Sequence, residues 1–302
     1  MTCFSAAGTG SNLLLSAVVD GQTGAASTVH FNYVAPTITN FLNLAAFPTA
    51  GSVPITINGT NFGPIGGVTP LVQYGPATNT SLFTALGCAV TVAQSRIVCT
   101  VAPGFGVAHW AVQLDNQRSA LSSQSTTYQN PAITAAHVTT SDGTMTTTGG
   151  TPITIDGSNF GAVASGAALI LAYSDGSFNY AASNCIVSIA HTRMICTSAP
   201  GVGASHRFTV SVGGLSSPQS PLSASVSYSV PNITTVTTAG TLSTGGGQPI
   251  TLDGTNFGPT TGNPVVVSCL PLQAILHDCE CCSADAIRLG ALPRNRLRGD
   301  DR

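Results

Sequence analysis

One string returns three times along this chain with small changes. INGTNFG, IDGSNFG and LDGTNFG occupy residues 57–63, 155–161 and 252–258, and their first glycines are 98 and 97 residues apart. A period of that length is typical of a small all-β domain that has been copied head to tail. The loop is therefore either a repeated active site or a repeated structural joint.

Other motifs recur in a fixed order around this loop. Each unit opens with Pro-x-Ile-Thr, and Pro-Ile-Thr-Ile or Pro-Ile-Thr-Leu comes directly before the loop. The alternating β-branched residues predict strands, and proline is tolerated where a strand begins. We predict whole units at residues 36–130 (unit one) and 131–230 (unit two), the end of an earlier unit at 1–35, and the start of a third at 231–267. Because the units abut without a linker, the array is expected to be a stiff rod.

The composition changes where the third unit breaks off. Residues 271–302 hold five of the nine arginines, the only glutamate and three of the nine cysteines. We interpret residues 268–302 as a tail unrelated to the repeats, either an artefact of the gene model or a disordered basic tip. Its His-Asp-Cys-Glu-Cys-Cys string at residues 277–282 resembles a soft-metal cluster, but it lies wholly within this tail, so we predict no metal site from it.

Units one and two contain matching cysteine hairpins. Cys88 and Cys99 are eleven residues apart, as are Cys185 and Cys196. A two-residue turn at residues 93–94 would place the first pair directly opposite each other, and the same arithmetic aligns the second pair, close enough for disulfides. Zinc ligation is the alternative, but neither pair has a further Cys or His at metal-ligand spacing. Two disulfides are expected, and they favour an extracellular parent protein.

Together these motifs resemble the IPT/TIG family, the immunoglobulin-like fold shared by plexins, transcription factors and related receptors. The resemblance is carried by Pro-x-Ile-Thr, Gly-x-Pro-Ile-Thr-Ile-x-Gly-x-Asn-Phe-Gly, the Cys…Cys hairpin and Ala-Pro-Gly-x-Gly, over about residues 1–267. It implies an all-β chain of tandem immunoglobulin-like β-sandwiches of the early-set type. It also implies extracellular arrays on receptors and adhesion proteins; other relatives bind DNA or are accessory modules of starch-acting enzymes.

The residue types of the repeated loop favour a structural joint. The first glycine is expected to supply a positive φ, and the asparagine to tolerate the left-handed region and bond its own backbone. The phenylalanine is expected to plug one end of the core, and the last glycine to let the chain turn away. These roles fall on Gly59, Asn61, Phe62 and Gly63, on Gly157, Asn159, Phe160 and Gly161, and on Gly254, Asn256, Phe257 and Gly258.

A catalytic or calcium-binding role for the loop would rest on Asp156 and Asp253. The matching residue in unit one is Asn58, which caps a turn equally well but cannot act as a base. A calcium site needs more acidic ligands than each unit has. The sequence also lacks a Gly-x-Ser-x-Gly elbow, and its carboxylates are too sparse for a glycosidase pair. We predict no enzyme, no cofactor and no metal.

Two further residue types remain candidates. His109 and His206 follow Pro-Gly-x-Gly at matching offsets, which suggests a pH switch, although a loop histidine without a named partner is more often structural. Asn58, Asn79 and Asn232 begin N-glycosylation sequons, which arise often by chance in a chain rich in Ser and Thr. With the cysteine pattern, the sequons support a secretory parent.

Charge excludes nucleic acid as a partner. The chain has no lysine, and residues 1–270 hold four arginines against six aspartates, so no basic stripe exists. The sequence shows neither a signal peptide nor an apolar stretch long enough to span a membrane.

The favoured hypothesis is a non-enzymatic fragment of an extracellular or cell-surface protein. Its repeats would act as a spacer and bind a protein or glycan ligand, with membrane attachment only through missing parts of the parent. The alternative is an accessory module of a secreted carbohydrate-active enzyme, and a third option is a secreted matrix component.

Overall fold

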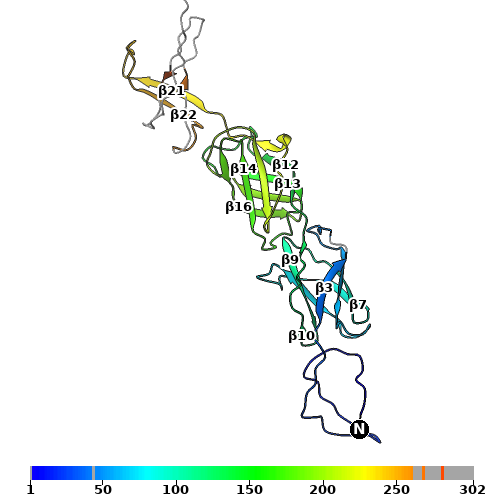
Figure 1. The fold of residues 1–302 in the computed structure, drawn as a ribbon. Helices are drawn as coiled ribbons and strands as arrows, with labels where there is room; N and C mark the ends of the chain where they lie inside the picture. Colours follow the sequence, from blue (N-terminus) through cyan, green and yellow to red (C-terminus); the bar gives the residue numbers. More distant parts are fainter. Residues whose placement is uncertain (1, 43–44, 261–266, 269–279, 282–302) are drawn as a thin grey trace, which may run out of the picture.

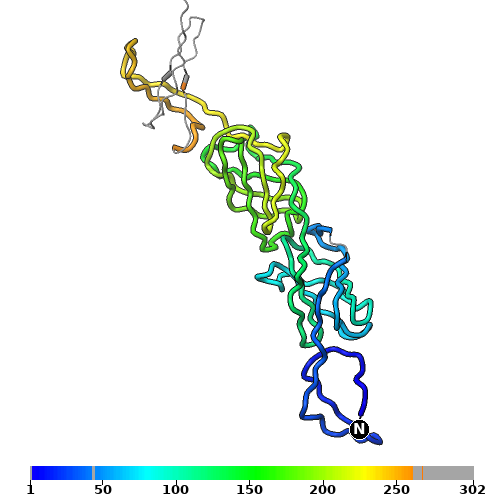
Figure 2. The backbone as a smooth tube through the Cα atoms, in the orientation of Figure 1, coloured from blue at the N-terminus to red at the C-terminus, as the bar shows by residue number. Residues whose placement is uncertain are grey.

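The computed structural model describes residues 2–42, 45–260, 267–268 and 280–281, and its regular structure is almost entirely β. The repeats follow one another along one long axis, with the N-terminus at one end and the third repeat toward the other (Figure 1). The backbone trace shows the same end-to-end course (Figure 2). The fold is a tandem array of immunoglobulin-like β-sandwiches.

Unit one is a sandwich of two antiparallel sheets. One sheet has the order β3-β4-β8-β7, and the other has the order β10-β9-β5-β6, with β11 also paired to β9. The strands are β3 (Thr37–Leu42), β4 (Pro54–Thr60), β5 (Leu71–Gly75), β6 (Phe83–Thr84), β7 (Leu86–Val92), β8 (Arg96–Thr100), β9 (Val107–Leu114), β10 (Gln117–Arg118) and β11 (Thr126–Thr127).

Unit two repeats this plan. Its sheets have the orders β12-β13-β17-β16 and β15-β14-β18-β19, with β20 also paired to β18. The elements are β12 (Ala132–Val138), β13 (Pro152–Ser158), β14 (Leu169–Ser174), β15 (Asn179–Ala181), β16 (Ser183–Ile189), β17 (Arg193–Thr197), β18 (His206–Val212), β19 (Leu215–Ser216), the 3-10 helix η1 (Leu222–Ala224) and β20 (Ser225–Val226).

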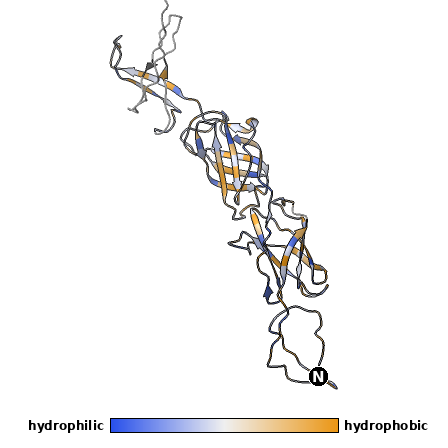
Figure 3. Ribbon diagram, viewed as in Figure 1, coloured by the Kyte–Doolittle hydropathy of each residue, from blue (hydrophilic) through white to orange (hydrophobic). Residues whose placement is uncertain are grey.

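The alternation of residue types along each strand decides which face packs inward. In β4, Ile55 and Ile57 are buried, whereas Thr56 and Asn58 are partly exposed. Because successive side chains of a strand point to opposite faces, this pattern lines one face of the sheet with apolar groups. Figure 3 shows apolar and polar positions mixed in this way along the strands of both units.

A pair of buried tyrosines closes the same end of each core. Tyr74 stacks on Trp110 with ring centroids 3.9 Å apart, and its hydroxyl lies 3.0 Å from that of Tyr128. Tyr173 and Tyr228 form the matching pair in unit two, at 2.8 Å. Each hydroxyl has a hydrogen-bond partner, so the polar end of a large apolar ring is buried at little cost.

The cysteine hairpins have a longer turn than the predicted one. Val90 pairs with Ile97, but Val92 pairs with Arg96, so the turn contains three residues and the register shifts within β7. Gln94 at the tip has a φ of 64°, and the matching His191 in unit two also has 64°. The predicted two-residue turn at residues 93–94 is therefore wrong, because the left-handed residue at the tip adds one position.

The array is less complete at its two ends. Before unit one there is a short hairpin of β1 (Val18–Val19) and β2 (Gln22–Thr23). The third repeat contributes β21 (Asn232–Thr238) and β22 (Ile250–Thr255), and beyond them β23 (Val267–Ser268) pairs with β24 (Glu280–Cys281). The remainder of the tail, and most of its cysteine string at 277–282, lies outside the described residues.

Within the described part of the chain, no helix has both the length and the hydropathy needed to cross a membrane.

Candidate functional site

The first glycine of the repeated loop is required for a different reason from the expected one. Gly59 does not have a positive φ, and neither do Gly157 and Gly254. A Cβ at Gly59 would lie 2.0 Å from the Thr37 carbonyl oxygen and 2.3 Å from the Phe62 ring. The expectation of a positive φ is wrong, because what excludes a side chain here is the close approach of the neighbouring strand.

A bulge in the first strand of each unit produces this close approach. The pairing of β3 with β4 shifts by one residue between Ile38 and Asn40, and β12 shifts against β13 in the same way. A Cβ at Gly157 would accordingly lie 1.9 Å from the Ala132 carbonyl oxygen. Only glycine allows the backbones to come this close.

The loop asparagine fastens the loop to the chain that enters its unit. Asn61, Asn159 and Asn256 have φ values of 61°, 62° and 63°, in the left-handed region. We expected their side-chain amides to bond their own backbone two residues on. They donate instead to the carbonyl of the residue that precedes the first proline of the unit. These carbonyls belong to Ala35 at 3.1 Å, Asn130 at 3.2 Å and Val230 at 3.0 Å.

The loop phenylalanines and the last glycines complete this end of each unit. Phe62 and Phe160 are buried in the cores, with 1% and 0% of their surface exposed, whereas Phe257 is partly exposed. Gly63, Gly161 and Gly258 have φ values of 76°, 84° and 86°, which favour glycine.

The repeated loop and the cysteine hairpin form one continuous end surface. In unit two, the amide of His191 at the hairpin tip donates to Gly161 O at 2.7 Å, and the amide of Phe160 donates to His191 O at 3.2 Å. In unit one, the amide of Gln94 makes the same bond to Gly63 O at 2.8 Å. Backbone hydrogen bonds therefore join two motifs that are about thirty residues apart in sequence.

This end surface of unit two contacts unit one through Thr49. The Thr49 hydroxyl lies 2.9 Å from Nδ1 of His191, and its backbone amide donates to Oδ1 of Asn159 at 3.4 Å. Thr49 is 1% exposed, whereas His191 and Asn159 are partly exposed, so the two hydrogen bonds are partly buried. Asn159 also donates to Oε1 of Gln129 in the connection between the units, at 3.3 Å.

An apolar contact lies beside these hydrogen bonds. Phe105 of unit one packs against the core of unit two, and Leu215 of unit two packs against the core of unit one. A Cβ at Gly213 would lie 2.3 Å from the Phe105 ring, so the hairpin between β18 and β19 fits closely against it. We call Thr49, Phe105, Asn159, His191 and Gly213 the joint.

Residues before unit one make a comparable contact on its other end. The hydroxyl of Thr9 donates to Asp115 at 2.6 Å, and the amide of Gly10 donates to Gln117 at 3.1 Å. The side-chain amide of Gln117 donates in turn to Tyr33 O at 2.6 Å. Asp115 occupies the hairpin position that Gly213 occupies in unit two, so the same hairpin faces the preceding repeat at both places.

Both expected cysteine pairs are joined in the structure. Disulfides link Cys88 to Cys99 and Cys185 to Cys196, each with Cα atoms 4.1 Å apart. They tie β7 to β8 and β16 to β17, and β7 and β16 are edge strands of their sheets. Cys3 is exposed and has no disulfide partner among the described residues.

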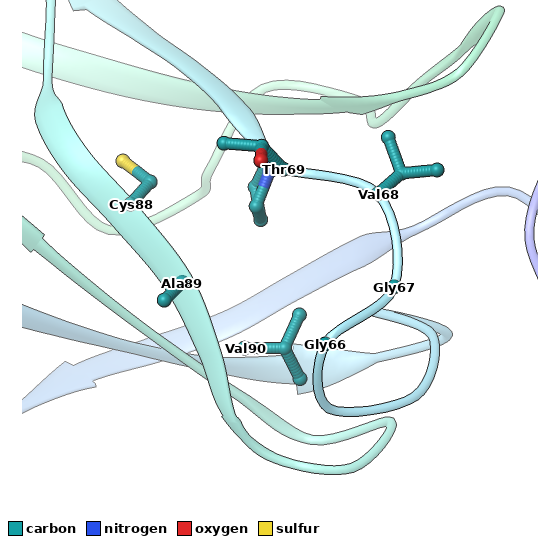
Figure 4. Close-up of a pocket in the computed structure, with 8 residues that line it drawn as sticks. Gly66, Gly67, Val68, Thr69, Cys88, Ala89 and Val90 are labelled. Atoms are coloured by element: carbon teal, nitrogen blue, oxygen red, sulfur yellow. The ribbon is translucent and has the colours of Figure 1, made fainter.

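A groove lies beside each of these edge strands. In unit one the groove has a volume of about 130 Å³ and is lined by the loop at residues 66–70 and by β7 residues 88–90. Figure 4 shows this loop facing Cys88, Ala89 and Val90. In unit two the matching groove has about 330 Å³ and is lined almost entirely by apolar residues, including Val163, Leu169 and Ile186. An edge strand next to an apolar groove is a common surface for contact with an extended chain.

The loop aspartates belong to surface ladders of polar side chains. Arg193 on β17 donates to Asp156 on β13 at 2.6 Å, and His137 on β12 lies 3.9 Å from the same carboxylate. This pairing raises the pKa of the Arg193 guanidinium. In unit one, Arg96 donates to Asn58 at 3.3 Å in the same place. An asparagine serves equally well there, which fits a structural role.

The two histidines that the sequence aligned are not equivalent. His109 Nδ1 lies 3.0 Å from Ser122 O, and Arg207 donates to the corresponding Ser220 O, so His109 matches Arg207. His206 matches Ala108, and it is the first residue of β18, not a loop residue. Trp110 follows Gly106 by four residues, whereas the matching Phe208 follows Gly203 by five. The sequence alignment did not show this extra residue in unit two.

The three sequon asparagines differ in exposure. Asn58 lies within β4 and is bonded to Asn40 at 2.8 Å, so its amide is already engaged. Asn79 is exposed in the loop between β5 and β6, and the hydroxyl of Ser81 donates to it at 3.2 Å. Asn232 is exposed at the start of β21.

Among the described residues, no group of three or more His, Cys, Asp or Glu side chains is placed to hold a metal ion.

The family comparison identifies one segment. Residues 138–230, nearly all of unit two, match the family model of the IPT/TIG domain. This segment resembles an IPT/TIG domain. Unit one shares with this matched segment the sheet order, the disulfide hairpin, the tyrosine pair and the repeated loop. The comparison with curated proteins found no match.

Several solved structures resemble the chain distantly. A protein crystallised with a xylogluco-oligosaccharide is 15% identical, covering 78% of this chain and 49% of its own, with a TM-score of 0.35. SGBP-B from a complex xyloglucan utilization locus in Bacteroides uniformis is 17% identical, covering 70% of this chain and 58% of its own, with a TM-score of 0.25. Invasin, a bacterial integrin-binding protein, is 15% identical, covering 66% and 40%, with a TM-score of 0.28.

The chain thus spans about half the length of the solved structures that it matches. At these scores, the likeness carries no inference about what this chain binds.

Sequence reasoning missed most of the joint. Thr49 and Phe105 come from segments that do not recur in the same form in unit two, where Thr147 and Val202 occupy the matching places. The only sequence signal for Thr49 was that a threonine, Thr147, recurs at the matching loop position of unit two. Nothing in the sequence indicated that Thr49 contacts His191, which lies 142 residues further on.

Proposed function

We propose that this chain is a non-enzymatic stretch of an extracellular or cell-surface protein, in which the repeats form a stiff spacer that presents ligand-binding surfaces for adhesion or recognition. The observation that carries the proposal is the joint, which combines partly buried hydrogen bonds with apolar packing. A flexible tether between domains needs neither, whereas a spacer of fixed length needs both.

The two disulfides support the extracellular setting. Bridges of this kind form and persist in oxidising compartments and are rare in the cytosol. Each one fastens an edge strand at the side of its sandwich, beside a groove, so it also stiffens a surface that is open to a partner. A protein or glycan ligand is proposed to contact such edges and end loops, as is common for β-sandwich modules.

The alternative role as an accessory module of a carbohydrate-active enzyme depends on a surface for sugars. Trp110, the one tryptophan of the chain, has 0% of its surface exposed and stacks on Tyr74 inside the core. It therefore does not offer a stacking surface to a glycan. No specific observation favours this alternative over the spacer.

Small-angle X-ray scattering of the full chain tests the spacer. The double variant Thr49→Ala, His191→Ala removes the hydroxyl–imidazole bond of the joint without touching either core. We expect a broader distribution of particle lengths than in the unchanged protein. Thr147→Ala is the matched control, because Thr147 holds the corresponding place in unit two, where its carbonyl accepts from Gly201 at 3.0 Å.

An unchanged length distribution in the double variant, or an equal broadening with Thr147→Ala, would contradict a stiffening role for the joint. Ligand recognition is tested separately, by probing the immobilised, unreduced chain with arrays of glycans and of extracellular proteins. Retention that disappears when the disulfides are reduced supports the proposal. Equal retention by the reduced chain contradicts a role for the folded repeats in recognition.

A further inference from the structure

His206 is a fully buried histidine that the proposed function does not use. It begins β18, has 0% of its surface exposed, and lies beneath the loop at residues 199–203. This loop is the Ala-Pro-Gly-x-Gly motif at the end of unit two from which the chain leaves for the third repeat. In unit one the matching loop carries Phe105, which packs on the next unit.

Hydrogen bonding fixes the tautomer of His206. Its Nε2 lies 3.0 Å from the carbonyl oxygen of Val202, in the centre of the loop. A carbonyl oxygen can only accept, so Nε2 carries the hydrogen and Nδ1 of the neutral ring is an acceptor. Nδ1 has no hydrogen-bond partner and is itself buried.

Three tyrosine rings surround the imidazole. Tyr173 on β14, Tyr180 on β15 and Tyr228 after β20 lie with ring centroids 5.7, 5.4 and 5.4 Å from that of His206, all at steep angles to it. Their hydroxyls are engaged elsewhere. Tyr180 donates to Val202 O at 3.2 Å, Tyr228 donates to Ala199 O at 2.7 Å, and the Tyr173 hydroxyl accepts from Ala199 N at 3.0 Å.

One carboxylate faces this cluster. Asp175, in the turn between β14 and β15, approaches Gly203 from the same side as Nε2 of His206. Its other oxygen accepts from the amides of Ser177 and Phe178, at 2.9 and 2.8 Å. Arg207, the next residue on β18, is turned away and donates to Ser220 O at 2.6 Å. A proton on His206 would thus meet one partly engaged anion and three neutral tyrosines.

We propose that His206 is an acid-sensitive latch on the loop at residues 199–203. The neutral ring holds the loop through Val202, and protonation places a new N–H donor at Nδ1, where the surrounding side chains offer no acceptor. The ring then has to move toward water, which releases the loop and loosens the end of unit two that faces the next repeat. Unit one lacks this latch, because Ala108 and Phe83 stand where unit two has His206 and Tyr180.

The direction of the pKa shift of His206 agrees with release of the loop in acid. Burial lowers the pKa of His206 below its ordinary 6.5, and the hydrogen bond to Val202, the charge of Asp175 and the backbone of Gly203 only partly oppose this. The unfolded or open chain then binds more protons than the closed unit. The stability that the neutral ring gives unit two is therefore complete above 6.5 and is lost as the pH falls from 6.5 toward the lowered value.

Hydrogen exchange of the full chain tests the latch. After correction for intrinsic rates, amides in residues 199–208 should exchange about tenfold faster at about pH 5 than at about pH 7, and at most about thirtyfold, because about 1.5 pH units separate pH 5 from the ordinary pKa. The matching peptide of unit one, residues 102–110, is the internal control and should show no such change. Equal acceleration in both peptides, or in neither, overturns the proposal.

Two variants keep the test decisive. His206→Gln retains a donor for Val202 but cannot titrate, so the difference between the two pH values should disappear; if it persists in the folded variant, another group is responsible. Asp175→Asn keeps the turn acceptor and removes the facing charge, so the NMR titration midpoint of His206 should fall further below that of the unchanged chain. A midpoint that stays the same or rises contradicts the arrangement described.

Discussion

Substituting Gly157 with alanine is the sharpest test of why the loop glycine recurs. The added Cβ would lie 1.9 Å from the Ala132 carbonyl oxygen and 2.7 Å from the Phe160 ring. A contact of that length with backbone cannot be relieved by a side-chain rotation, so β12 has to move away from β13. Overpacking of a close-packed site costs about 1–3 kcal/mol, and we place this substitution at the upper end.

A matched control separates crowding from backbone conformation. Gly150 is also in unit two and has a φ of 82°, but a Cβ there would meet nothing within 4 Å. Gly150→Ala should therefore cost only the left-handed strain, about 1 kcal/mol. Gly157 has no positive φ, so its cost reports the contact alone.

Calorimetry of the full chain measures the difference. For a domain of this size, 1 kcal/mol shifts the melting temperature by about 4–8 °C, so Gly157→Ala should lower the unit-two transition by about 12 °C or more. Gly150→Ala should lower it by less than half of that. An equal or smaller shift for Gly157→Ala would refute the close-approach explanation and return the loop glycine to an ordinary turn role.

Three further outcomes are expected. Cys88→Ser should destabilise unit one by about 3 kcal/mol and leave the unit-two transition in place, as seen by calorimetry; an unchanged unit-one transition would remove the bridge from the account. On secretion from a glycosylating cell, peptide mass spectrometry should find glycan at Asn79 and none at Asn58, and the reverse occupancy would contradict the exposure difference. Asn159→Ala should speed hydrogen exchange at the entry to unit two, and unchanged exchange there would show that its bond to Asn130 O contributes nothing.

The fold could be predicted from the sequence because its evidence is local and repeated. Alternation in Pro-Ile-Thr-Ile fixes which face of β4 is buried, and a cysteine pair eleven residues apart brings its members together in any short hairpin. The turn length was predicted wrongly, since the left-handed conformation of Gln94 and His191 has no strong residue signature. A register error of one residue near the turn still left the cysteines opposite each other.

The roles within the repeated loop could not be predicted in full, because they depend on residues far away in sequence. The space at Gly59 is taken by Thr37, and the partner of Asn61 is Ala35, 26 residues earlier. His206 illustrates the same limit, since a one-residue difference in loop length moved it from an aligned loop position into the core. Tertiary neighbours, not local propensity, decided each of these cases.

Residual dipolar couplings measured separately for units one and two in the full chain test the central claim most directly. The joint predicts that both units fit a single alignment tensor of equal magnitude and orientation, as two parts of one rigid body. Tensors of clearly different magnitude in the unchanged protein would mean that the units reorient independently, and they would contradict the account of a stiff spacer.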